Sequence, residues 1–460
     1  MRKTVEYERK LEAPSGFELP DLGGVPLEPR VFNSVYHDTA SRSLARVGIT
    51  LRRRIERGTS LWQLKLPAAD ARLELEEPGG PVGPPERLRT LIRTHERHGP
   101  VAPVADLRTR RNGALVSVNG TKAEVTVDSV AVMDAHRVES EFVELEIEVV
   151  DGGPDGVEQI VKELERAGAF VGSETPKLFR VLELEPRRPA SDAPFESLRA
   201  LLQHQLDQIL AHDPGTRLGV DPESLHDMRV AVRRSRALLR AGRMLVATDA
   251  SVLSEELTWL GTVLGAVRDL DVLLDHLRGE AATLGETDRP AASRLLRTLD
   301  RRRGRARRVL LRALDGERYG ALLDGFEETL STFEPSDDPS TLAALAKRQL
   351  RALRRDVRAL GEAPENEALH GLRKRGKRTR YAYELAGADA VVKRAKAFQD
   401  VLGEHQDSVI AEEQLRELAV NAPFDQVIAA GRLIEREQAR QAEARAAWRD
   451  AWRRLQRAAR

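Results

Sequence analysis

The sequence predicts an α+β multidomain protein, with an antiparallel β domain first and an all-α domain after it. Up to about residue 185, apolar and polar residues alternate, which is the period of a strand whose side chains point to opposite faces. After residue 196 the period changes to that of amphipathic helices rich in Leu, Ala, Arg and Glu. Residues 186–196 between them are proline-rich and hardly apolar, as a linker would be. We therefore expect domains at 1–185 and 197–460.

Composition narrows the class of protein. The chain has 460 residues, too many for one ordinary core, and no cysteine, which excludes disulfides and thiolate metal sites and fits a reducing compartment. No run of about 18 apolar residues is present, so we expect no membrane span. The first residues are charged and lack the apolar core of a secretion signal. These features predict a cytoplasmic protein.

The β domain is predicted from its alternating segments. These are residues 50–56, 61–66, 71–77, 114–120, 123–130 and 142–150. Asn119 and Gly120 join two of them, and this pair is typical of a type I′ hairpin turn. Residues 155–169 predict one amphipathic helix that ends near Gly168.

Several of these strands carry one fully charged face. Glu6, Glu8 and Lys10 share a face of the first strand, and acids dominate the first and last strands while bases dominate the middle ones. In an ordinary sandwich such faces are simply solvated. If they line the inside of a barrel instead, the buried charges need a ligand. A polyanion bound with metal fits, because arginines bind phosphate oxygens and carboxylates bind Mg²⁺ or Mn²⁺.

Motifs along the first 185 residues resemble those of the CYTH family of triphosphate tunnel metalloenzymes. In order, they are ExExK at Glu6, Glu8 and Lys10, the stretch from Tyr36 to Arg54, WQLKLP at 62–67, TRR at 109–111, the acidic strand 124–128, ExExE at 144–148 and PKLFR at 176–180. The resemblance implies an eight-stranded antiparallel tunnel that binds a linear triphosphate with divalent metal.

The resemblance also implies roles for individual residues. The catalytic residues would be Glu6, Glu8, Lys10 and Lys65. The substrate-binding residues would be Arg52, Arg54, Arg110, Lys177 and Arg180. The ligands of Mg²⁺ or Mn²⁺ would be Glu6, Glu8, Asp128, Glu144 and Glu146. Alternation favours Arg110, which shares a face with Arg108, over Arg111, although a bulge would reverse the choice. Glu8, Glu148 and Lys65 all stay open as the general base.

Two basic stripes are predicted in the helical domain. The first comprises His226, Arg229, Arg233 and Arg236, and the second comprises His370, Arg373, Lys377 and Arg380, at spacings of three and four residues. Like charges so spaced destabilise a helix unless an anion or acids lie opposite them, and Asp269 and Asp407 are candidate acids. A solvated basic face is the alternative for either helix alone. The occurrence of two copies favours a shared anion-binding surface.

The stripes belong to an internal repeat. LHDMRVAVRRSR (225–236) matches LHGLRKRGKRTR (369–380), and LGAVRDLDVL (264–273) resembles LGEHQDSVIA (402–411). We expect two similar helical bundles, at about 197–333 and 341–460, related by a pseudo-twofold axis.

The paired LHxxRxxx(R/K)RxR motif resembles that of the CHAD domain, over about residues 200–460. The resemblance implies two four-helix bundles around a basic central cavity, with inorganic polyphosphate as the ligand. The second copy departs from the first where Gln406 replaces Arg268 and where Gly376 is expected to interrupt the helix.

Together the two resemblances imply metal-dependent hydrolysis of inorganic triphosphate or short polyphosphate by the tunnel, and polyphosphate binding by the helices. Association with polyphosphate granules in the cytoplasm is a further expectation. The alternatives are a non-catalytic polyphosphate-binding protein, a nucleic-acid-binding protein, a thiamine triphosphatase and an adenylate cyclase. Nucleic acid is disfavoured, because aromatic residues make up only 4% of the chain and few of them accompany the basic stripes. The oligomeric state stays open.

Overall fold

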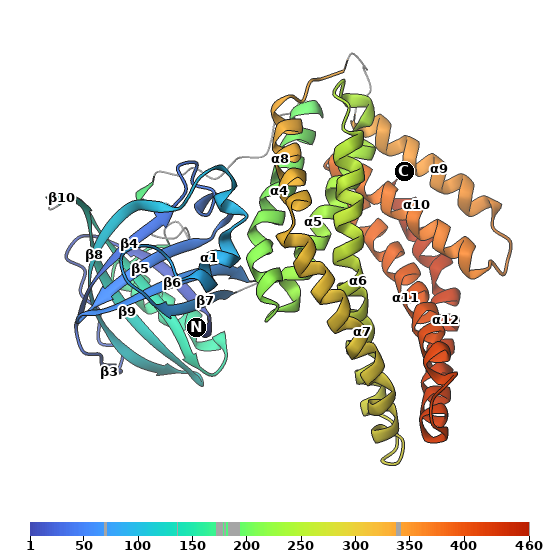
Figure 1. The fold of residues 1–460 in the computed structure, drawn as a ribbon, viewed down its shortest axis with the longest axis horizontal. Coiled ribbons are helices and arrows are strands. Elements are labelled where there is room, and N and C mark those ends of the chain that lie inside the picture. Colours follow the sequence, from blue (N-terminus) through green and yellow to red (C-terminus); the bar gives the residue numbers. More distant parts are fainter. Residues whose placement is uncertain are drawn as a thin grey trace. The chain divides into compact units, whose positions relative to one another are not determined.

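The computed structural model describes residues 1–68, 71–135, 137–171, 178, 181–182, 194–336 and 342–459. Most of the predicted linker, together with Lys177 and Arg180, lies outside the described residues. The chain divides into two compact units, Met1–Arg187 with Asp207–Met228, and Arg188–Leu206 with Arg229–Arg460. In Figure 1 the strands are blue to teal and the helices of the second domain are green to red.

One antiparallel sheet forms the first unit. Its strands, within the described residues, are β1 (Arg2–Glu6), β2 (Glu8–Ala13), β3 (Val25–Pro26), β4 (Arg30–Asp38), β5 (Thr50–Glu56), β6 (Thr59–Ala68), β7 (Ala71–Pro78), β8 (Ala102–Val118), β9 (Thr121–Asp134) and β10 (Arg137–Asp151). The hydrogen-bonded order is β1-β7-β6-β5-β4-β8-β9-β10-β2, with β3 paired to β8. At the hairpin between β8 and β9, Asn119 and Gly120 have φ values of 49° and 78°, as a type I′ turn requires.

The two ends of this path are consecutive in the chain. β1 pairs with β7, β2 pairs with β10, and only Tyr7 separates β1 from β2. The sheet therefore returns to the stretch of chain from which it starts, although its ladder is interrupted at Tyr7. If β1 and β2 are taken as halves of one strand and the short β3 is left out, the sheet has eight strands, the number expected, but no continuous ladder closes it.

The apolar core of this domain lies outside the sheet. Leu51, Leu64 and Leu75 are fully buried together with Leu88 and Ile92 of α1 (Glu86–Ile92). A second cluster joins β2, β9 and β10 to α2 (Val157–Arg166), which lies within the helix predicted at 155–169. Because side chains alternate along a strand, burying these apolar faces outward turns the charged faces inward.

Asp38 anchors the loop between β4 and β5. Its side chain is fully buried; Oδ1 accepts hydrogen bonds from the backbone N–H groups of Thr39 and Leu44 at 2.7 and 3.0 Å, and Oδ2 accepts from that of Ala45 at 2.9 Å. The loop also contains the short 3₁₀ helix η1 (Ala45–Val47) and ends at Gly48, whose φ is 79°. Asp38 thus fixes the point at which β5 begins.

Helices make up most of the described residues of the second domain. Its helices are α4 (Pro194–Leu218), α5 (Pro222–Ala241), η4 (Arg243–Leu245), α6 (Ser251–Ala282), α7 (Arg289–Asp315), α8 (Glu317–Ser331), α9 (Leu342–Ala359), α10 (Asn366–Leu385), α11 (Asp389–Ala419) and α12 (Phe424–Ala458). α4 begins at Pro194, so residues 194–196 of the predicted linker are helical. None of the described helices is both long and apolar enough to span a bilayer.

The helix bounds repeat as the sequence does. α5 and α10 are offset by 144 residues at both ends, and the starts of α6 and α11 by 138 residues. The second repeat consists of the four helices α9–α12, whereas the first carries α8 in addition. Buried leucines of α6, α7, α11 and α12 form one cluster, so the two repeats share part of their core.

We expect Asp38→Ala to lower the free energy of unfolding of the β domain by about 3 kcal/mol or more, because three backbone donors lose a buried carboxylate acceptor and hydrogen bonds to charged groups contribute about 1.5–3 kcal/mol each. Urea denaturation measures the loss. The matched control is Asp21→Ala, which removes one exposed contact to the Gly23 N–H group. Equal effects of the two changes would contradict the anchoring role of Asp38.

Candidate functional site

The inside of the sheet forms a cavity of 270 Å³ whose lining is polar throughout. Its acids are Glu6, Glu8, Glu74, Glu76, Glu124, Glu146 and Glu148; its bases are Arg2, Lys10, Arg30, Arg52, Arg54, Lys65, Arg72 and Arg111; the remaining side chains are Thr4, Tyr36, Thr50 and Gln63. The predicted site residues of β1, β2, β5 and β6 therefore all line one cavity, together with Glu146.

Two lysines lie among the carboxylates. Lys65 Nζ is 2.5 Å from Glu6 Oε2 and 4.0 Å from Glu8 Oε2. Lys10 Nζ is 3.1 Å from Glu146 Oε1, 3.6 Å from Glu144 Oε1 and 3.9 Å from Glu8 Oε1. Glu8 thus lies between two ammonium groups that come from different strands.

The carboxyl groups of Glu74 and Glu6 are hydrogen-bonded to each other, and their pKa values shift in opposite directions. Burial, reinforced by the hydrogen bond with Glu6, raises the pKa of Glu74 to about 8, so this carboxyl is protonated at neutral pH. Burial would also raise the pKa of Glu6, but the hydrogen bond from Glu74 and the charge of Lys65 outweigh it and lower that pKa. Burial and the charge of Glu6 raise the pKa of Glu148. Negative charge is therefore in excess in this part of the cavity.

The same side chains carry oxygen donors of the kind that a divalent cation prefers. Glu74 Oε1 is buried and has no hydrogen-bond partner. Glu6, Glu8 and Glu148 line the cavity with it, and carboxylate oxygens are the ligands that Mg²⁺ and Mn²⁺ prefer. Sequence reasoning gave Glu74 no role in metal binding. Its signal was its alternation with Leu73 and Leu75.

Asp128 and Glu144 lie opposite each other on β9 and β10, and both are buried. Neither of them lines the cavity. Asp128 accepts two hydrogen bonds from Arg111, from Nε to Oδ1 at 2.7 Å and from Nη2 to Oδ2 at 2.6 Å, and Arg111 also bonds to Glu146. The arrangement makes Asp128 a partner of this arginine, and metal ligation by Asp128 and Glu144 stays a prediction.

Arg110 is not in the cavity. It lies with Arg108 on the outer face of β8, where both line a separate pocket of 540 Å³. Alternation correctly placed these two on one face, but the register shows which face is inside: β8 pairs Arg111 with Arg30 of β4 and with Asp128 of β9. Arg111 therefore occupies the position expected of Arg110.

Two arginines of β5 lie across the cavity from the acids of β10. Arg52 donates through Nε to Gln63 Oε1 at 2.7 Å and through Nη1 to the Tyr36 hydroxyl at 3.2 Å. Arg54 lies 3.7 Å from the ring centroid of Phe32 and donates to Glu56 at 2.7 Å. Burial and the charge of Arg52 lower the pKa of Arg54 to about 10, so it stays charged at neutral pH. The segregation of charge by strand, visible in the sequence, thus persists in the cavity.

The two basic stripes of the helical domain come together. Arg233 of α5 feels the charges of Arg373 and Arg380 of α10, and with burial these lower its pKa. Burial, together with Arg373, Arg233 and Arg229, lowers the pKa of Lys377 to about 8. The described side chains of both stripes are half-buried, so their cations are concentrated on one surface. Arg236 adds to it, with its pKa lowered by burial and by Arg240.

The second copy differs from the first in two details. Burial and the charge of Lys374 lower the pKa of His370, which hydrogen-bonds to Gln406. Gly376 does not interrupt its helix, because α10 is continuous through it. A Cβ there would lie 3.2 Å from Phe398 Cε1, so the glycine allows α11 to pack closely on α10. His226 is half-buried and belongs to the first unit.

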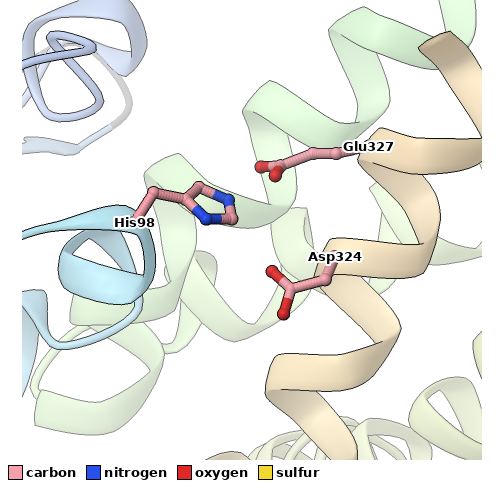
Figure 2. Close-up of side chains that lie close together, drawn as sticks. All are labelled: His98, Asp324 and Glu327. Atoms are coloured by element: carbon pink, nitrogen blue, oxygen red, sulfur yellow. The ribbon is translucent and has the colours of Figure 1, made fainter.

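Figure 2 shows Asp324 and Glu327 of α8, whose carboxylates point to the same side of that helix, together with His98 of η2 (His95–His98). Asp324 and His98 are exposed, and His98 belongs to the other unit. We assign no site to this group.

Comparisons with known proteins separate the same two parts. Residues 4–179 match the family model of the CYTH domain, and residues 200–416 match that of the CHAD domain. Two uncharacterized proteins of Mycobacterium tuberculosis, from strains CDC 1551 and H37Rv, are 32% identical over 479 residues, which is 94% of this chain and 93% of theirs.

Two solved structures are similar to parts of the chain. PptA from Streptomyces chartreusis is 22% identical, with a TM-score of 0.49, over 56% of this chain and 99% of its own. The CHAD domain from the plant Ricinus communis is 28% identical, with a TM-score of 0.47, over 57% of this chain and 92% of its own.

We expect Arg111→Ala to lower the free energy of unfolding by about 3–5 kcal/mol, because it removes the guanidinium that the buried Asp128 and the half-buried Glu146 share. Arg110→Ala is the matched control, and on the exposed face of β8 it should cost no more than about 0.5 kcal/mol. Denaturant unfolding of the two variants compares them. A larger loss for Arg110→Ala would indicate that Arg110, and not Arg111, faces the inside of the sheet.

Proposed function

This chain belongs to the family of proteins that join a CYTH domain to a CHAD domain, and from that membership we propose that its β domain hydrolyses inorganic triphosphate or short polyphosphate with Mg²⁺ or Mn²⁺. We propose further that its helical domain binds inorganic polyphosphate. The main support for the proposal is the cavity inside the sheet, which is lined by both carboxylates and arginines. A linear triphosphate bound with a divalent metal requires both at once.

In this reaction water attacks the terminal phosphorus atom, the bridging P–O bond breaks, and phosphate and pyrophosphate leave. The transition state is loose, so positioning and charge neutralisation supply most of the acceleration. Arg52, Arg54 and Lys10 bind phosphate oxygens, and Arg111 adds a cation beside them. Glu6, Glu8 and Glu146 would hold the metal, with Glu148 and Glu74 next to them. The metal, when bound, neutralises charge on the phosphate oxygens.

The attacking water must lose a proton, and Glu148 is the favoured acceptor. It lines the cavity, and burial raises its pKa above that of an ordinary glutamate. Lys65 is less suited, because its ammonium group is already paired with Glu6. Glu8 lies between two lysines, and we assign it to metal binding.

The lining of the cavity favours an inorganic substrate. Its side chains are polar, and Tyr36 is the one aromatic ring among those that line it in the described residues. A nucleoside or thiamine triphosphate would find phosphate contacts there but little apolar surface for its ring. A panel of triphosphates, assayed separately for phosphate and pyrophosphate release, distinguishes hydrolysis of inorganic triphosphate from cyclisation of ATP and from an idle, purely binding tunnel.

The helical domain supports binding of a longer chain. Arg229 and Arg233 of α5 and Arg373 and Lys377 of α10 concentrate positive charge where the two repeats meet. A polymer of phosphates can contact both stripes at once, which raises its affinity over that of a short chain. Placement of the protein on polyphosphate granules would follow from such binding.

We expect Glu6→Ala and Glu8→Ala each to lower triphosphate hydrolysis in Mg²⁺ by more than about 100-fold, since even residues that only support a metal ligand contribute about 10–100-fold. Phosphate release with Mg²⁺, with Mn²⁺ and with EDTA measures the effect. Glu141→Ala, an exposed change on the same sheet but outside the cavity, is the control. Near-normal turnover in both cavity variants would refute the metal site.

We expect Arg229→Ala combined with Arg373→Ala to weaken binding of long-chain polyphosphate in EDTA by about 1.5–3 kcal/mol for each arginine, the scale of hydrogen bonds to charged groups. The loss should be smaller for triphosphate, which is too short to contact both stripes. Binding should also weaken steeply with salt, because polyanions release counterions on binding. Arg301→Ala with Arg305→Ala, both exposed on α7, is the matched control. Equal losses would indicate a diffuse basic coat instead of a site.

A further inference from the structure

We infer that the glycine and the aspartate of the LGxxxD motif in each helical repeat are positioning residues that hold one phosphate-binding arginine in place. The two sets are Gly265 and Asp269 with Arg229, and Gly403 and Asp407 with Arg373. The inference rests on the proposed polyphosphate binding by the helical domain. It assigns a role to the half of the repeat that carries no basic stripe.

In the first repeat, the guanidinium of Arg229 lies against the bare helix surface at Gly265. A Cβ at Gly265 would be 3.5 Å from Arg229 Nη2 and 3.6 Å from Nε. One turn further along α6, Asp269 Oδ1 lies 2.9 Å from Arg229 Nη1. A side chain larger than that of alanine at Gly265 would occupy the place of the guanidinium.

The second repeat reproduces this arrangement. A Cβ at Gly403 would be 3.6 Å from both Nε and Nη2 of Arg373, and Asp407 Oδ1 lies 3.9 Å from Nη2. The aspartate again follows the glycine by four residues. The copies differ between these positions, where Arg268 corresponds to Gln406, yet the same three residue types remain in contact. Their recurrence favours a built arrangement over a chance surface pair.

These ion pairs contribute little to the stability of the fold. The side chains of Asp269 and Asp407 are 68% and 54% exposed, and exposed ion pairs contribute little to stability. The arginines are 22% and 23% exposed, among cations that repel them. A carboxylate that fixes such an arginine before the ligand arrives reduces the ordering cost of binding.

The two sets also lie within electrostatic reach of each other. The negative charges of Glu404 and Asp269 both act on Asp407. The alternative is that the aspartates only dilute the positive charge of the stripes. The two roles predict opposite effects of removing the carboxylates, so binding measurements can separate them.

The test replaces both carboxylates in the full chain by Asp269→Asn with Asp407→Asn and measures binding of long-chain polyphosphate in EDTA. We expect affinity to fall about tenfold, the scale of immobilising two side chains anew, although the surface loses two negative charges. The slope of log Kd against log salt concentration should stay unchanged, because the same cations still neutralise the phosphates.

The matched control is Asp300→Asn with Asp425→Asn. These exposed residues pair with Arg278 and Arg294, which belong to neither stripe, and the change should alter affinity by less than about twofold.

A glycine series tests the steric half of the inference. Gly265→Ala with Gly403→Ala should leave affinity unchanged, because the added Cβ atoms would be in ordinary van der Waals contact. Gly265→Leu with Gly403→Leu should weaken binding as much as the asparagine pair does. Thermal unfolding of each variant shows whether a loss of affinity is due to misfolding. If the leucine variants misfold, the asparagine pair, which adds no volume, decides whether the positioning role is correct.

Tighter binding by the asparagine pair, with a steeper salt slope, would show that the aspartates only dilute charge and would overturn the inference. The arginine double variant separates this failure from that of the proposed function. If wild-type protein binds polyphosphate and Arg229→Ala with Arg373→Ala weakens it, while the asparagine pair does not, only the positioning role is wrong. If wild-type protein does not bind polyphosphate, the proposed function of the helical domain fails and the inference falls with it.

Discussion

Ionised side chains inside a sheet must be paired across strands, and the rest of the β domain is arranged around that requirement. Lys65 pairs with Glu6, Lys10 with Glu146, and Arg111 with Asp128, each from a different strand. A buried charge without such a partner would cost several kcal/mol. The apolar core is accordingly displaced to the outside, under α1 and α2. The pairs that stabilise the domain are therefore largely made by the residues proposed to bind metal and phosphate.

The helical domain meets the same electrostatic problem in another way. Its cations lie on neighbouring helices of two repeats, where Arg233 and Lys377 are opposed by other positive charges. The acids that pair with cations there include Glu384, which pairs with Arg234, and the two aspartates of the LGxxxD motifs. Positive charge thus remains in excess there, whereas the cavity of the β domain holds both signs. One domain suits an anion bound with metal, and the other suits an anion alone.

Alternation and helical period predicted most of the fold, because each reports which side chains share a face. They could not report which face is inside. Arg108 and Arg110 share a face as predicted, yet only pairing with β4 and β9 shows that Arg111 faces the cavity. Gly376 was expected to interrupt a helix on propensity, but contact with Phe398 outweighs that preference. The raised pKa of Glu74 depends on burial, which no local pattern contains.

The strand split at Tyr7 has a consequence for how the β domain is made. Residues 2–6 pair with β7 and residues 8–13 pair with β10, which ends at Asp151. β2 therefore finds its partner in β10 only after about 140 further residues have been synthesised. Contacts between such distant segments delay folding, because the loop must be closed before the pairing stabilises it. Until then the charged face that becomes the cavity wall stays in water, where its ions need no partners.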